Sequence, residues 1–211
     1  MTDWATISSL ATAGGTLVLA AATFAAVRSA NRSARATERA LLAGIRPLLV
    51  TSRMQDPPEK VGFVDDHWVK VPGGQGVAEA TDEVIYLAIA LRNAGTGLAV
   101  LDRWDFYADR AVGGEASYRP REEFRRLTRD IYIPGGDLGF WQGAIRGRDD
   151  PWFDAAREAI LERRPMTVDL LYGDHEGGQR TISRFALLPY GDATWLAVVG
   201  RHWNLDRADP R

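Results

Sequence analysis

The first part of the chain contains a long run without a single charged side chain. It extends from Trp4 to Val27, which is 24 residues. A helix of that length reaches about 36 Å, and the apolar core of a bilayer is about 30 Å thick. The pattern therefore predicts a transmembrane helix. Two alternatives stay open: a helix buried in the protein or against partner chains, and a cleaved signal peptide, although the positive charges follow the run instead of preceding it.

Arginine lies on one side of this run only. No Lys or Arg precedes it, whereas the positions just after it are Arg28, Arg32 and Arg35. Cytoplasmic flanks of membrane helices are enriched in Lys and Arg. We therefore expect the N-terminus outside and the rest of the chain in the cytoplasm, at the inner (cytoplasmic) membrane, with the lipid bilayer as a partner. Trp4 lies where an interfacial aromatic anchor is expected.

The helical pattern continues beyond the uncharged run. Residues 28–43 contain no Gly or Pro, and Gly44 and then Pro47 follow, as expected where a helix stops. We divide the chain into residues 1–45, a transmembrane helix and helical stalk, and residues 46–211, one further domain. Small or apolar residues recur on one helical face: Ala13, Thr16, Ala20, Thr23, Val27, Ala30, Ala34, Thr37 and Leu41. Such a stripe is a candidate surface for homo-oligomer formation, although an alanine-rich composition also produces it.

After Pro47 the hydrophobic period becomes that of β-strands. In residues 83–95, Ile85, Leu87, Ile89 and Leu91 alternate with another set of side chains, so one face is fully apolar. The expected strands are 46–53, 67–71, 83–95, 98–109, 130–135, 138–145, 165–174, 179–190 and 194–205, with a helix opening at Asp150-Pro151. We expect a mainly β fold after the long N-terminal helix: an antiparallel β-sandwich, immunoglobulin-like in the broad sense, with two short helices.

Two turn motifs carry a resemblance. Asn93-Ala94-Gly95-Thr96-Gly97-Leu98-Ala99 follows one strand, and Tyr172-Gly173-Asp174-His175-Glu176-Gly177 forms a later hairpin. Together with the N-terminal helix they resemble bacterial single-pass membrane proteins of unknown function, in which a small β-sandwich carries N-x-G-x-G-x-A and Y-x-D-x-x-G motifs. The resemblance implies a location and a fold, and it brings no catalytic residues.

Overall charge gives little reason to expect a nucleic-acid partner, since the formal net charge is −2 and the pI is about 6.0. The densest basic cluster comprises Arg119, Arg121, Arg125, Arg126 and Arg129. It suits contact with anionic lipid or a nucleic-acid backbone, but it also suits a solvated helix with internal ion pairs, which we favour.

Candidate chemistry is sparse. The three histidines are His67, His175 and His202, and three histidines can hold a catalytic zinc ion, but their spacing is not that of a metal motif. The residues around His175 read more simply as a polar hairpin turn. Cysteine and a G-x-S-x-G elbow are missing, and Ser183 has no histidine near it in sequence. We expect no catalytic residue, no metal and no cofactor.

The leading interpretation is a membrane-tethered, non-enzymatic module that binds an unidentified protein. One alternative is a metal-binding or hydrolytic domain that uses His67, His175 and His202. Another is a soluble component of an assembly, whose apolar helix is buried by partner chains.

Overall fold

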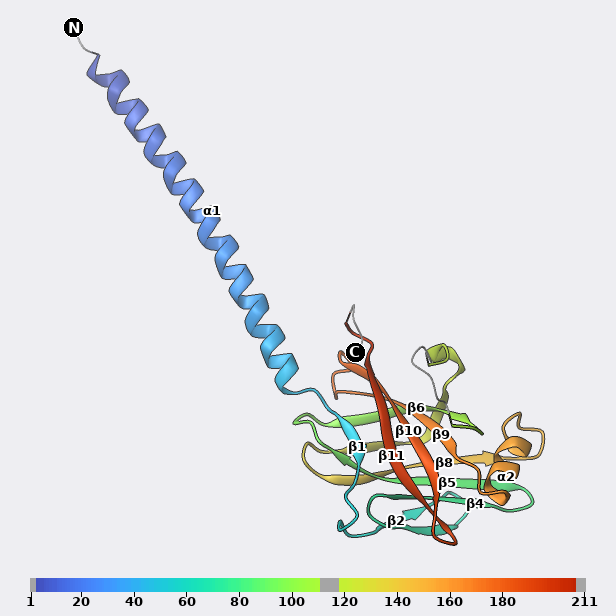
Figure 1. The fold of residues 1–211 in the computed structure, drawn as a ribbon. Helices are drawn as coiled ribbons and strands as arrows, with labels where there is room; N and C mark the ends of the chain where they lie inside the picture. The colour runs from blue at the N-terminus through green and yellow to red at the C-terminus, as the bar shows by residue number, and fades with distance from the viewer. Residues whose placement is uncertain (1–2, 111–117, 208–211) are drawn as a thin grey trace. The chain divides into compact units, whose positions relative to one another are not determined.

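The computed structural model of the protein describes residues 3–110 and 118–207 and consists of two units, residues 1–44 and 45–211 (Figure 1). The first unit is one α-helix, α1 (Trp4–Gly44). Inside α1, the side chains of residues 4–7, 9, 11, 39, 42 and 43 lie outside the described part. The expected anchoring role of the Trp4 side chain therefore falls outside it as well.

The described side chains of α1 are exposed, although many of them are apolar. Leu17, Leu19 and Phe24 are 74%, 71% and 68% exposed. The candidate membrane span, Thr12–Glu38, has a mean hydropathy of 1.3, and its helix by itself buries none of it. A helix that is apolar on its whole circumference is normally covered by protein or by lipid. By length and composition, α1 could therefore cross a membrane.

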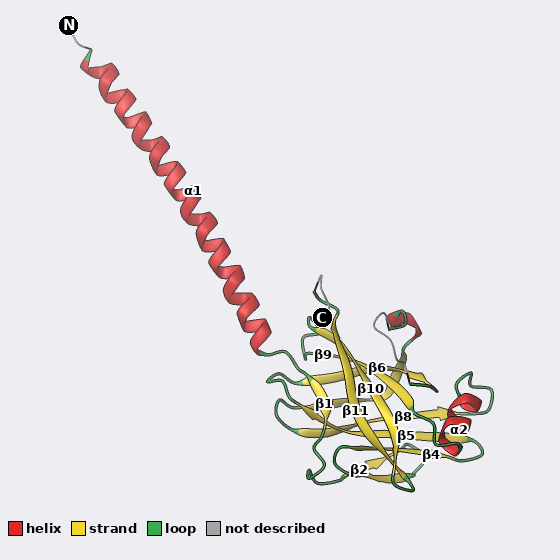
Figure 2. Ribbon diagram, viewed as in Figure 1, coloured by secondary structure: helices red, strands yellow, loops and turns green. Residues whose placement is uncertain are grey.

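The second unit is mainly β and antiparallel (Figure 2). One nine-stranded sheet contains β1 (Leu49–Thr51), β4 (Gln75–Ala80), β5 (Val84–Asn93), β6 (Ala99–Tyr107), β7 (Arg125–Ile133), β8 (Leu138–Arg146), β9 (Met166–Gly173), β10 (Arg180–Tyr190) and β11 (Thr194–Asn204). Its order is β1-β5-β4-β11-β10-β9-β6-β7, and β8 also pairs with β5. A separate two-stranded sheet is formed by β2 (Glu59–Gly62) and β3 (Trp68–Val71).

The sheet curls into a half-barrel, and the expected two-layer sandwich is not confirmed. The reason lies in β4, which pairs with β5 on one side and with β11 on the other. Gly76 is the residue of β4 that pairs with both neighbours, opposite Ile89 and Trp195. Backbone hydrogen bonding is therefore continuous where a sandwich would separate its two sheets.

Both faces of β5 are buried, which goes beyond the single apolar face expected from its alternation. Ile85, Leu87, Ile89 and Leu91 belong to the main core inside the curl. On the other face Tyr86, Ala88 and Ala90 join a second core under the β2–β3 hairpin, together with Val61, Phe63, Val69, Val71 and Val77. The second face is covered by the β2–β3 hairpin. The sequence pattern did not predict this hairpin, because β2 was not among the expected strands.

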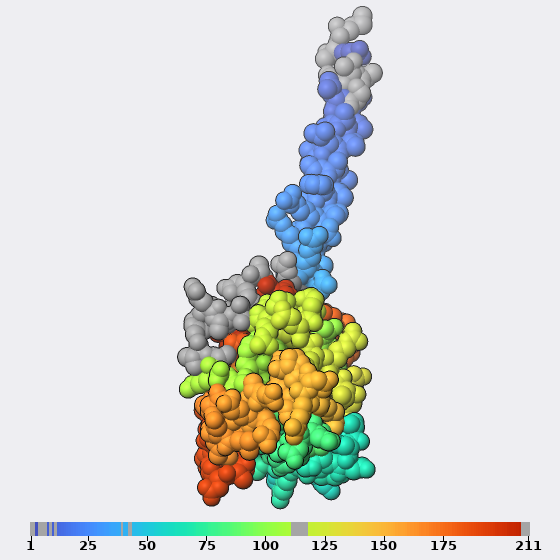
Figure 3. Space-filling model, turned by 90° about the vertical axis from the view of Figure 1, so that its right-hand side faces the viewer, coloured from blue at the N-terminus to red at the C-terminus, as the bar shows by residue number. Residues whose placement is uncertain are grey.

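The expected helix after Asp150-Pro151 is present as α2 (Phe153–Leu161), and Phe153, Ala156 and Ala159 bury its inner face in the main core. Figure 3 shows α2 in orange at the surface beside the yellow β7–β8 region.

The prediction of a helix over the arginine cluster is wrong. That segment forms a single 3-10 turn, η1 (Arg121–Glu123), and then enters β7 at Arg125.

Two arginines of that cluster form ion pairs within the fold, and a third, Arg129, donates to the side-chain oxygen of Gln142 at 2.8 Å. Arg119 donates to Asp105 at 2.8 Å, and Arg125 makes two hydrogen bonds with the carboxylate of Asp150 at 2.5 and 2.6 Å. The guanidinium of Arg125 also lies 3.5 Å from the ring centroid of Trp152. The cluster therefore contains structural ion pairs that join the β6–β7 region to neighbouring elements.

Asn93 joins the first resemblance motif to three parts of the domain. Its side-chain oxygen accepts hydrogen bonds from the backbone N–H groups of Leu48 and Gly95, both at 3.0 Å. Its amide nitrogen donates to the carbonyls of Gly97 at 2.7 Å and Ile133 at 3.0 Å. Both polar atoms of the fully buried Asn93 side chain are therefore hydrogen-bonded. Their bonds hold the chain just before β1 against β5 and β7.

We predict that Asn93→Ala lowers the unfolding free energy by about 3 kcal/mol, because it leaves several buried backbone groups without a partner. Urea unfolding followed by tryptophan fluorescence measures the loss. Ala substitution of the exposed Asp192 is the control and should change it by less than about 0.5 kcal/mol. Equal stability of the two variants would show that the bonds of Asn93 are dispensable.

Candidate functional site

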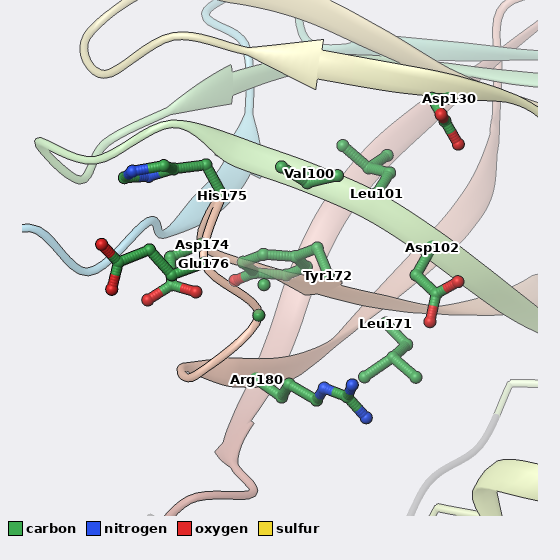
Figure 4. A pocket seen from close by; sticks show the side chains of 12 residues that line it. Val100, Leu101, Asp102, Asp130, Leu171, Tyr172, Asp174, His175, Glu176 and Arg180 are labelled. Atoms are coloured by element: carbon green, nitrogen blue, oxygen red, sulfur yellow. The ribbon is translucent and has the colours of Figure 1, made fainter.

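A pocket of about 370 Å³ lies at the β9–β10 hairpin, and most of its charged groups are acidic. Its floor is Leu101, Leu171, Tyr172 and Gly173, all buried. Charged side chains and one histidine surround it: Asp102, Asp130, Asp174, His175, Glu176 and Arg180. In Figure 4, His175, Asp174 and Glu176 lie on one side of Tyr172, Asp102 lies on the other, and Arg180 lies below Tyr172. Four carboxylates against one arginine favour a positively charged ligand over an anion.

Strand irregularity creates the pocket. Leu101 pairs with Tyr172 of β9 and Ile131 of β7, but the next paired residue of β6 is Arg103. Relative to β9, Asp102 is therefore an extra residue in β6, which is a β-bulge. On the other side, residues 127–130 of β7 are the surplus, because Arg103 pairs with Arg126. A bulge bends the strand and redirects the side chain at that point. Here it places the exposed Asp102 at the rim of the pocket.

The hairpin that closes the pocket is the polar turn expected from the sequence. The backbone carbonyl of Asp174 accepts from the N–H of Gly177 at 3.1 Å, and its Oδ1 accepts from the N–H of Gly178 at 2.9 Å. Gly177 has a φ of +73°, a conformation that glycine adopts at no steric cost. The second resemblance motif thus forms a tight turn, in which His175 and Glu176 are exposed to solvent.

Tyr172 begins a chain of hydrogen bonds that leads away from the pocket. Its hydroxyl accepts from the backbone N–H of Leu49 at 3.1 Å and lies 2.8 Å from the hydroxyl of Ser183. Ser183 Oγ lies 2.6 Å from Nδ1 of His202. Because the N–H of Leu49 can only donate, Tyr172 is free to donate to Ser183 and Ser183 to a neutral His202. Tyr172 and Asn93 therefore hold the consecutive backbone N–H groups of Leu49 and Leu48.

The Ser183–His202 pair was not expected, because Ser183 has no histidine near it in sequence. The two residues are opposite each other in the β10–β11 ladder, a proximity that follows from register and not from sequence spacing. Ser183 is fully buried, so a substrate cannot reach its hydroxyl. The pair is consequently a structural hydrogen bond and lacks the accessible nucleophile of a hydrolase.

The three histidines lie in three different settings. His67 stacks on Tyr86 with ring centroids 4.0 Å apart and bonds to Glu79 at 2.9 Å. His175 lies on the hairpin rim, and His202 bonds to Ser183. Over residues 3–110 and 118–207, no three His, Asp or Glu side chains form a group able to hold a metal ion. The structure therefore does not support a metal site built from the three histidines.

A buried charge cluster on β6, β9 and β10 was missed by the sequence analysis. Asp169 and Arg184 face each other across the β9–β10 ladder with two hydrogen bonds of 2.7 and 2.6 Å, and Asp105 is the partner of Asp169 in β6. Burial raises the pKa of Asp169, and Arg184 opposes that shift. The sequence signal was a single charge inside each of two apolar strands. Arg119 and Arg184 balance the two carboxylates, which indicates a structural network.

Comparison of the chain with protein-family models, with curated proteins and with solved structures finds no match. The coarse part of the resemblance is shown by the structure: an apolar N-terminal helix precedes a β-rich domain. In that domain the motif residues Asn93 and Tyr172 both hold the start of β1. Their roles are structural, and the exposed surfaces of the protein are the candidates for its function.

We predict that the unfolding free energy falls as pH is lowered through about 6.5, because burial lowers the pKa of His202. The unfolded chain then binds a proton before the folded chain does, and the slope approaches about 1.4 kcal/mol per pH unit for this one group. Urea unfolding at pH 7.5 and 5.5 measures it. His202→Gln removes the titrating group, so its stability should fall less over this interval. Identical pH dependence in both proteins would contradict this account.

Proposed function

We propose that the protein is a membrane-tethered, non-enzymatic interaction module: α1 anchors it, and the β domain of residues 45–211 binds another protein. The observation that carries the proposal is the exposure of apolar side chains along α1. Leu17, Val18, Leu19 and Phe24 are each at least two-thirds exposed. Soluble proteins rarely leave a continuous apolar surface of this kind in water. Lipid is the simplest cover for a single helix of this length.

The described threonine hydroxyls of the uncharged run are compatible with lipid. The hydroxyls of Thr12, Thr16 and Thr23 donate to the carbonyls four residues earlier, at 2.8 to 2.9 Å. Hydroxyls bonded within their own helix leave no unsatisfied donor in the bilayer core. These bonds support a helix that can stay in lipid without polar partners from other chains.

The orientation in this proposal is N-terminus outside and domain in the cytoplasm, at the inner membrane of a bacterium. Its support is the position of Arg28, Arg32 and Arg35 after the uncharged run, with no Lys or Arg before it. Cationic flanks resist translocation and remain on the cytoplasmic side.

The pocket at the β9–β10 hairpin is the surface that we propose for the protein partner. It is concave, its charges come from three strands and a turn, and its rim is mainly acidic. A partner segment with exposed Lys or Arg side chains fits this charge. Charge complementarity of this kind contributes mostly to specificity and to the rate of association.

Contact between two copies of α1 is the second interaction that we propose. The small-residue stripe is exposed at its described positions, and the hydroxyls of Thr16, Thr23 and Thr37 are bonded within the helix. The stripe therefore presents methyl groups and backbone, which lets two helices approach closely.

We predict that the protein remains with the membrane after alkaline carbonate extraction. Leu17→Arg puts a charge inside the apolar run at a cost of about 3 kcal/mol and should release much of the protein. Ala34→Arg lies beyond the run and should not. Release of the unchanged protein would instead favour a soluble assembly whose partner chains bury the helix.

Protease added to intact spheroplasts tests the orientation in the same cells. The domain should be spared until the membrane is opened. Digestion from outside would show the reverse topology, and an N-terminus near Ser29 would show a cleaved signal peptide.

A further inference from the structure

Three arginines share one face of α1 directly after the apolar run. In a helix with 3.6 residues per turn, Arg28, Arg32 and Arg35 fall within roughly 60° of arc. They line a single hollow of about 390 Å³ together with Phe24, Val27 and Asn31. Within the described part of the chain, none of these three arginines forms an ion pair. Three guanidinium groups therefore share one face of the helix, and no carboxylate among the described residues pairs with them.

The spacing along the helix is longer than the headgroup layer is thick. From Val27 to Arg35 the axis advances about 12 Å, and the headgroup layer adds only about 5 to 7 Å per leaflet. In an upright helix Arg35 would therefore lie beyond the lipid headgroups. Because the three arginines share a face, tilting the helix toward that face brings all of them to the surface of the leaflet. Arginines distributed around the helix could not reach the surface together.

We infer that Arg28, Arg32 and Arg35 form a binding surface for the phosphate groups of anionic phospholipids on the leaflet where α1 leaves the bilayer. The inference rests on the proposed membrane anchor and adds the lipid class and the face of the helix. Guanidinium binds phosphate oxygens through paired hydrogen bonds, and its charge is drawn to an anionic leaflet. Phe24 and Val27, in the same hollow, are suited to contact the adjoining acyl chains.

The arginine face leaves the small-residue stripe accessible. Ala30, Ala34 and Thr37 lie roughly 180° to 240° around the helix from Arg28, on the opposite side. A helix that rests its arginines on lipid therefore turns this stripe away from the membrane. In the stalk, lipid binding and contact between two helices therefore use different faces, whereas Val27 belongs both to the stripe and to the arginine hollow.

An exchange of neighbouring residues tests the inference at constant composition. The variant carries Arg32→Ser with Ser33→Arg, and Arg35→Ala with Ala36→Arg. Net charge and helix length stay the same, but two guanidinium groups move about 100° around the helix. Both full-length proteins are placed in nanodiscs of equal parts phosphatidylcholine and phosphatidylglycerol. Lipid that stays bound after mild detergent extraction is counted by mass spectrometry.

The unchanged protein should retain phosphatidylglycerol in preference to phosphatidylcholine, and the exchanged variant should lose at least fivefold of that preference. Each cation held at an anionic membrane surface changes the binding constant roughly fivefold. Equal preference in two proteins that both resist carbonate extraction would overturn the inference and leave the anchor intact. Carbonate release of the unchanged protein would overturn the anchor and the inference with it.

Discussion

The exposed apolar surface of α1 is the constraint on which the rest of the account depends. No described side chain of this 41-residue helix is buried, and Thr12–Glu38 is apolar enough to cross a bilayer. Burial of a Leu or Phe side chain is worth about 1.5 to 3 kcal/mol, so leaving many of them in water is unfavourable. This apolar surface therefore needs a cover, and lipid is the cover that we propose. This requirement supports a membrane-tethered module. The apolar helix is therefore stronger evidence for the function of the protein than any of its candidate catalytic groups.

The start of the domain is held by groups that the sequence presented as turn motifs. Asn93 and Tyr172 accept the backbone N–H groups of Leu48 and Leu49. A Cβ atom on Gly97 would approach the carbonyl oxygen of Ile45 to 1.7 Å, so only glycine fits there. The β5–β6 turn and the β9–β10 hairpin thus converge on the chain that leaves the helix. Motifs without catalytic chemistry here secure the first strand of the domain.

Strong local patterns were predictable, and long-range pairing was not. The apolar helix, the strand at residues 83–95 and the helix after Asp150 followed from period and from helix stop and start signals. The curl of the sheet depends on β4, whose Gly-rich beginning resembles a turn. The pairs Ser183–His202 and Asp169–Arg184 exist because of ladder register, which hydrophobic period does not specify. The segment at Arg119–Arg129 looked helical because charges alternate there, whereas its ion pairs with Asp105 and Asp150 hold it as a turn and a strand.

Covering α1 by lipid is the central claim, and spin labels on single cysteines test it most directly, since the chain has no cysteine of its own. Labels at Leu17→Cys and Ser33→Cys are exposed to oxygen, which concentrates in lipid, and to a nickel chelate, which stays in water. We expect oxygen to relax the label at position 17 and the chelate to relax the label at position 33. A label at position 17 that reacts to the chelate, or to neither reagent, would contradict a helix surrounded by lipid.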